Sequence, residues 1–138
     1  MEPGGSATDQ MFLSLEQFRK VWLKQGWSWD YRFSTIASSF HDDQTAEAEQ
    51  AISGTFTELF DHRTLGNAPE HIQDVAEAVG GVRADQRVYT MKTNGRLVPY
   101  ALWWPWGDEI TVSLRVGLAG YVSEQDLQRL QMNFNAIS

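Results

Sequence analysis

The apolar residues recur at helical spacing through the first half of the chain. A capping-box pattern at 14–17 is followed by apolar residues three and four apart, which predicts a first helix that begins at Ser14 and stops at Gly26. The same spacing predicts helices over about 43–60 and 67–79, the last ended by two glycines. Gly54 lies inside the helix predicted over 43–60 and indicates either a close contact with another helix or a weak point.

Residues 27–40 are compatible with two kinds of structure. Alternate residues are aromatic from Trp27 to Phe33, as in a strand. The apolar residues from Trp29 to Phe40 also fit the spacing of a helix, and they do so for about three turns. We therefore favour a second helix, capped by Ser28.

From Arg87 onward the period of the apolar positions changes to two. Asn94 and Gly95 separate two such segments, which predicts a hairpin with a two-residue type I′ turn. A third strand follows, and Ser123 then caps a last helix. The predicted fold is α+β, with four N-terminal helices, a three-stranded antiparallel meander at about 86–92, 97–104 and 109–118, and a C-terminal helix. Residues 1–10 are predicted to be a flexible tail, and 11–138 to form one domain.

The hairpin turns decide which strand residues face solvent. The Asn-Gly turn places Tyr89 opposite Tyr100, and a three-residue loop at 106–108 places Trp104 opposite Ile110. This register collects the large apolar residues of the third strand on one buried face. A two-residue second loop would bury the opposite face instead, and a further alternative is that helices cover both faces.

The favoured register leaves a small aromatic patch on the outer side of the sheet. It predicts that Trp103 and Trp106 are exposed beside Arg115. Exposed tryptophan next to arginine is typical of a protein-binding hot spot. We therefore expect a partner to bind through these residues.

The charge of the chain is uneven. The net charge is −7, and the segment 42–77 alone carries −8, with nine acidic residues against Arg63. We expect Asp42, Asp43 and Glu47 to contribute to an acidic face that attracts a basic protein partner and repels nucleic acid. The chain has no cysteine, no secretory-type N-terminus and no apolar run long enough for a membrane helix. A cytoplasmic protein that binds neither membrane nor nucleic acid is expected.

No arrangement of residues in the sequence indicates catalysis. Each histidine stands beside an acidic residue, but no two are three or four positions apart, so no metal site is predicted. The chain has no Gly-x-Ser-x-Gly motif. The glycines at 117 and 120 lack the lysine of a phosphate-binding loop. We expect no catalytic residues, no metal and no cofactor.

Two hypotheses for the function remain. The first is a small acidic interaction module without catalytic activity, which binds another protein or a second copy of itself. In size and charge it is analogous to bacterial accessory proteins of the immunity, antitoxin or chaperone type. The alternative is a small-ligand or enzymatic pocket, lined by aromatic residues, between the helices and the sheet. Asp30, His41 and Trp29 are the first candidates to line such a pocket.

Overall fold

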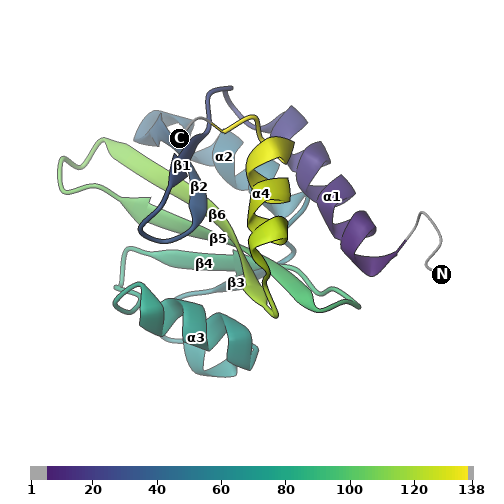
Figure 1. Cartoon of the computed structure of the whole chain (residues 1–138). Coiled ribbons are helices and arrows are strands. Elements are labelled where there is room, and N and C mark those ends of the chain that lie inside the picture. The colour runs from purple at the N-terminus through teal and green to yellow at the C-terminus, as the bar shows by residue number, and fades with distance from the viewer. Residues whose placement is uncertain (1–5, 137–138) are drawn as a thin grey trace.

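The computed structural model describes residues 6–136 and contains one six-stranded antiparallel sheet (Figure 1). Its strand order is β1-β2-β6-β5-β4-β3. The strands are β1 (Ser28–Asp30), β2 (Thr35–His41), β3 (Glu58–Phe60), β4 (Arg87–Thr90), β5 (Leu97–Pro105) and β6 (Thr111–Gly120). The helices are α1 (Ala7–Val21), α2 (Thr45–Ser53), α3 (Glu70–Ala78) and α4 (Glu124–Asn133), with the short 3-10 turns η1 (Asp42–Gln44) and η2 (Leu65–Asn67). No helix within the described residues is long and apolar enough to cross a membrane.

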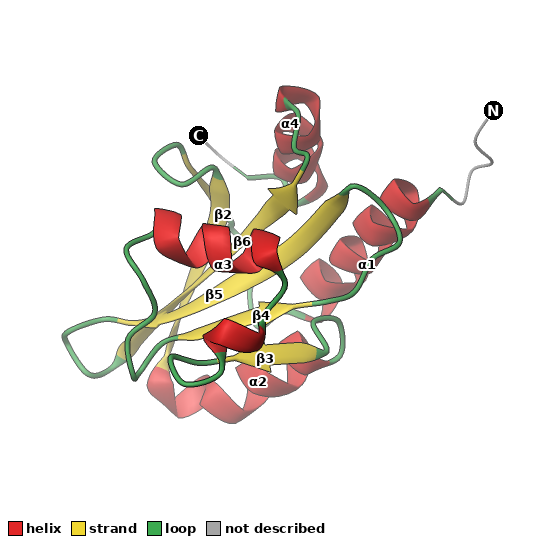
Figure 2. Ribbon diagram, turned by 90° about the horizontal axis from the view of Figure 1, so that it is seen from below, coloured by secondary structure: helices red, strands yellow, loops and turns green. Residues whose placement is uncertain are grey.

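Helices cover both faces of the sheet. The first face packs against α1, α2 and α4, and the second face packs against α3 (Figures 1 and 2). The first face holds the larger core, where the ring centroid of Phe18 lies 5.4 Å from the ring centroids of Trp22 and Phe56. The second core is smaller and includes Ile72 of α3 and Leu102 of β5.

The prediction of four N-terminal helices before a three-stranded meander is wrong. Residues 27–40 contain the hairpin of β1 and β2, with Ser34 at φ 52° in its turn. Ile36 and Phe40 are buried on the first face, and they stand four residues apart. Residues at this spacing share a face in a helix and also in a strand, so the helical stripe did not exclude a strand.

The helix boundaries in the N-terminal half also differ from the expectation. The helix predicted over 43–60 ends at Gly54, and the short strand β3 follows it. α1 begins at Ala7 and not at Ser14, because Ser6 caps it by accepting a hydrogen bond from the Asp9 backbone N–H at 3.2 Å. The predicted tail is therefore helical from residue 7, and residues 1–5 lie outside the described part of the chain.

The register of the β4–β5 hairpin is displaced by one residue from the predicted register. Tyr89 lies opposite Ala101 and not opposite Tyr100. Neither Asn94 nor Gly95 has the positive φ that a type I′ turn requires. Arg96 thus belongs to the loop, which is one residue longer than the predicted two-residue turn.

The β5–β6 hairpin is displaced as well, and this changes the face on which its residues lie. A hydrogen bond of 2.7 Å from the Trp106 N–H to the Thr111 carbonyl closes a loop at 107–110. The Asp108 carboxylate accepts hydrogen bonds from the N–H groups of Ile110 and Thr111 inside this loop. Trp103 consequently lies opposite Leu114, on the first face.

Arg96 is anchored to the last helix. Its guanidinium donates two hydrogen bonds to the Asp126 carboxylate, at 2.5 and 2.9 Å. This contact is the main reason that the pKa of Asp126 lies well below its usual range, although the burial of the carboxyl opposes the shift. The N–H and the hydroxyl of Ser123 also donate to this carboxylate and complete the capping box of α4.

We expect Trp103→Ala to lower the free energy of unfolding by ~3–5 kcal/mol, because Trp103 is only 3% exposed in the first core. Trp104→Ala should cost less, since Trp104 is half-buried on the second face. Denaturant unfolding of the two variants measures the difference. A larger loss for Trp104→Ala would contradict the observed register.

The pairing of Asp126 with Arg96 predicts a loss of stability in acid. The unfolded chain binds a proton at this carboxyl near pH ~3.9, whereas the folded protein keeps it ionised to lower pH. The stabilisation is therefore complete above about pH 5 and is lost as the pH falls below ~4. Chemical unfolding followed from about pH 5 down to about pH 2 should show a smaller decline in stability for Asp126→Asn than for the natural chain. An equal decline in both would exclude Asp126 as its source.

Candidate functional site

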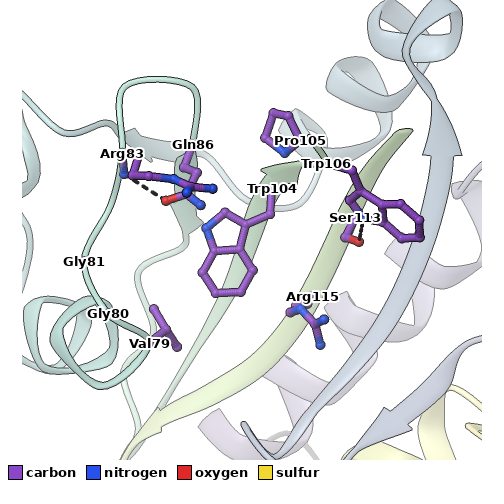
Figure 3. A pocket seen from close by; sticks show the side chains of 10 residues that line it. All are labelled: Val79, Gly80, Gly81, Arg83, Gln86, Trp104, Pro105, Trp106, Ser113 and Arg115. Carbon is purple, nitrogen blue, oxygen red and sulfur yellow. Dashed lines mark hydrogen bonds between the residues drawn. The ribbon is translucent and has the colours of Figure 1, made fainter. Parts of the chain in front are cut away.

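The second face of the sheet is only partly covered, and a cleft remains beside α3. It has a volume of about 370 Å³ and lies between the end of α3 and the central strands (Figure 3). We call it the Trp104 cleft. Its lining residues are Val79, Gly80, Gly81, Arg83, Gln86, Trp104, Pro105, Trp106, Ser113 and Arg115.

Trp104 lies in the middle of the cleft. Its position in β5 directs it to the second face, opposite Ser113 of β6. The ring of Phe33, from the turn between β1 and β2, packs edge-on against it at 6.1 Å between centroids. The indole also packs against the second core, and its remaining surface borders the cleft (Figure 3).

Arg115 lies beside this indole on the neighbouring strand. Its guanidinium carbon is 5.8 Å from the centre of the Trp104 ring and 5.7 Å from that of Phe33. It forms an ion pair with Asp30 of β1, and both side chains are 23% exposed. The Nε–H of Arg115 is buried and has no hydrogen-bond partner within the described structure. The ion pair holds the guanidinium in place and leaves this buried donor unused.

Two glycines build the wall of the cleft that faces α3. Gly80 and Gly81 have φ of 95° and 94°, a conformation that side chains oppose, and they turn the chain sharply at the end of the helix. The turn brings in Arg83, whose backbone N–H donates to the side-chain oxygen of the buried Gln86 at 2.8 Å. The Arg83 and Gln86 side chains lie side by side, on the side of Trp104 that carries the indole nitrogen (Figure 3).

The opposite wall is formed by Trp106, at the start of the β5–β6 loop. This side chain is 52% exposed, and its indole N–H donates to the Ser113 hydroxyl oxygen at 2.5 Å. The hydrogen bond fixes the orientation of an exposed ring. The cleft thus has a tryptophan at its centre and a second one at its rim.

Of the three residues predicted for the outer patch, the structure brings two to the cleft. Trp106 and Arg115 line it, but Trp103 does not. Trp103 is buried on the first face, with the Arg87 guanidinium 4.6 Å from its ring. The expected exposure of Trp103 is wrong because of the register shift, and Trp104 takes its place on the second face.

The acidic residues predicted to bind a partner lie elsewhere. Asp42 and Asp43 are exposed in η1, where His41 Nδ1 lies 3.2 and 2.9 Å from their carboxylate oxygens. Glu47 is exposed on α2. The segment 42–77 does not form one face, because α2 packs on the first side of the sheet and α3 on the second (Figure 2).

The three residues proposed for an alternative pocket are separated. Asp30 adjoins the Trp104 cleft through its ion pair with Arg115. His41 is exposed at the end of β2, and its Nδ1 accepts a hydrogen bond from the Asp43 N–H. Trp29 packs against the first core. Among the described residues, no group of three or more His, Asp or Glu side chains is placed to hold a metal ion.

The sequence prediction missed three polar or aromatic lining residues. Trp104 would have been found by the register that places Trp103 on the face of Leu114. Arg83 and Gln86 follow the glycine pair that was interpreted only as a helix end. The sequence did contain a signal for these residues, namely two consecutive glycines followed by polar residues shortly before a predicted strand.

Comparison with protein-family models, with curated proteins and with solved structures finds no match for this chain. The geometry and chemistry of the Trp104 cleft are therefore the basis for a functional proposal.

The ion pair of Asp30 and Arg115 should be stronger than an exposed pair. A double-mutant cycle with Asp30→Ala and Arg115→Ala should give a coupling energy of ~1–3 kcal/mol, because both side chains are mostly buried. The exposed pair of Glu16 and Lys20 is the matched control and should give less than ~1 kcal/mol. Equal coupling in the two cycles would show that the cleft is not rigidly built.

Proposed function

We propose that the protein is a non-catalytic binding module that holds a small ligand in the Trp104 cleft. The observation that carries the proposal is an open cleft of about 370 Å³ with one tryptophan at its centre and another at its rim. This volume lies within the range of small-molecule sites. Aromatic rings at such a site offer a large contact area for a flat apolar group, at little cost in conformational entropy.

The composition of the lining supports binding and not catalysis. The lining residues include no histidine, carboxylate, lysine or tyrosine that could transfer a proton at neutral pH. The only hydroxyl belongs to Ser113, and it accepts a hydrogen bond from Trp106. The two arginines remain protonated throughout the physiological range. The cleft can therefore hold and orient a ligand, but its own side chains supply no general base.

The proposal is tested with three probes of the same shape: phenylacetate, phenylacetamide and phenethylamine. At millimolar concentration, at least one of them should shift the indole N–H signals of Trp104 and Trp106 in NMR spectra. The signal of Trp27, which is buried in the first core, should stay in place. Binding of none of the three would contradict the proposed function.

Trp106→Ala should weaken binding of the active probe about three- to tenfold, which corresponds to the loss of one aromatic contact. The fold should be unaffected, because this side chain is half exposed. Tyr121→Ala is the matched control, since Tyr121 is 75% exposed and does not line the cleft. The same weakening in both variants would mean that the probe does not bind in the cleft.

A protein-interaction module is the second candidate, and an acidic stripe on α3 favours it. Glu70, Asp74 and Glu77 are exposed at helical spacing, and none of them forms an ion pair within the described structure. A basic partner could dock on this stripe beside the cleft. Such a partner fits the cytoplasmic accessory protein, of immunity, antitoxin or chaperone type, that size and charge predict.

Crosslinking in a cell lysate tests this second candidate. Changing the three acidic residues to lysine should abolish capture of a specific partner, whereas Glu124→Lys, on another helix, should not. Raising the salt from about 0.05 to 0.5 M should weaken capture several-fold. Capture that withstands both the charge reversal and the salt would contradict this candidate.

A further inference from the structure

We infer that the Trp104 cleft selects a monoanionic ligand, a flat apolar body that carries a carboxylate. This inference rests on the proposed function and names the class of ligand. It follows from the hydrogen-bonding groups and the charges that the cleft leaves unused.

The polar side chains of the cleft offer donors, while each of their two acceptor oxygens already accepts one hydrogen bond. The side-chain oxygen of Gln86 accepts from the Arg83 N–H, and the hydroxyl oxygen of Ser113 accepts from Trp106. The Gln86 amide N–H₂, the Trp104 indole N–H and the Arg83 guanidinium are donors. A ligand that supplies acceptors therefore matches the cleft better than one that supplies donors.

The charges of the cleft point to the same chemistry. Arg83 and Arg115 line the cleft, and no acidic side chain does. Asp30 compensates the charge of Arg115, whereas the guanidinium of Arg83 has no ion pair with any described residue. One positive charge is thus left over, in a protein whose net charge is −7. One uncompensated guanidinium balances the single charge of a carboxylate, whereas a doubly charged phosphate would keep one negative charge without a partner.

The arrangement of the groups places the two parts of such a ligand. The donors of Arg83, Gln86 and Trp104 gather on the side of the cleft next to α3, and Trp106 stands on the opposite side (Figure 3). A carboxylate can approach the donors while an attached ring lies along the tryptophans. A guanidinium presents two parallel N–H groups to the two oxygens of a carboxylate. This contact would orient the ligand as well as attract it.

The test compares the three matched probes by NMR titration on the natural chain and on Arg83→Gln. Phenylacetate should bind at least about tenfold more tightly than phenylacetamide and phenethylamine, as expected for a charge-assisted hydrogen bond. Arg83→Gln should remove this advantage, because it should weaken the binding of the charged phenylacetate much more than that of the neutral phenylacetamide. Arg83 is exposed, so the variant should fold normally. Arg63→Gln, an exposed arginine outside the cleft, is the control and should change neither affinity.

The outcomes separate this inference from the proposed function. If phenylacetamide binds as tightly as phenylacetate, the selection for an anion is wrong while the ligand-binding function stands. If phenyl phosphate binds more tightly than phenylacetate, the preference for a monoanion is wrong. If no probe binds, the proposed function itself fails. N-acetylphenylalanine and its amide form a further pair of probes. If N-acetylphenylalanine binds more tightly than both its amide and phenylacetate, the carboxylate comes from the C-terminus of a chain. If phenylacetate binds more tightly than N-acetylphenylalanine, the ligand is a free small molecule.

Discussion

The pairing of β5 with β6 is the constraint on which the rest of the structure depends. Consecutive tryptophans on β5 must point to opposite faces, and the pairing of Trp103 with Leu114 sends the first to the main core and the second to the cleft. A shift of one residue would exchange them, placing Trp104 among the helices of the first face. The core and the binding surface are thus set by one register and cannot vary independently.

Contacts outside the strands hold this register. At one end, Gly120 has φ 92° and approaches the Arg96 carbonyl so closely that no side chain would fit. The side chain of Arg96 is in turn bound to Asp126, at the start of α4. At the other end, the Asp108 carboxylate organises the loop before β6. Polar contacts therefore fix both ends of the β5–β6 hairpin. The pattern of apolar residues along the strands gives no sign of these contacts.

The dependence of the register on these polar contacts explains how much could be predicted from the sequence. The helix after Ser123 begins at its predicted cap. The helix before Gly80 ends where the glycines predicted, but it begins at Glu70 and not at 67. Three strands also lie close to the predicted ranges, but they are the centre of a six-stranded sheet. The register was not predictable from the Asn-Gly pair, because the tertiary contact of Arg96 lengthens the loop. The hairpin at 27–40 was missed because Ile36 and Phe40 share a face in either structure.

The cleft owes its chemistry to the same distribution of contacts. α3 covers one part of the second face, and Phe33 covers another, so Trp104 is neither buried nor fully exposed. Asp30 holds Arg115 in place, but Arg83 comes from a loop and forms no ion pair with another residue of the described part of the chain. In a protein with an overall negative charge, the exposed acidic residues are screened by salt beyond about 8 Å. At hydrogen-bond distance the donors of the cleft dominate, so an anion that reaches the cleft meets an attractive site on an otherwise repulsive surface.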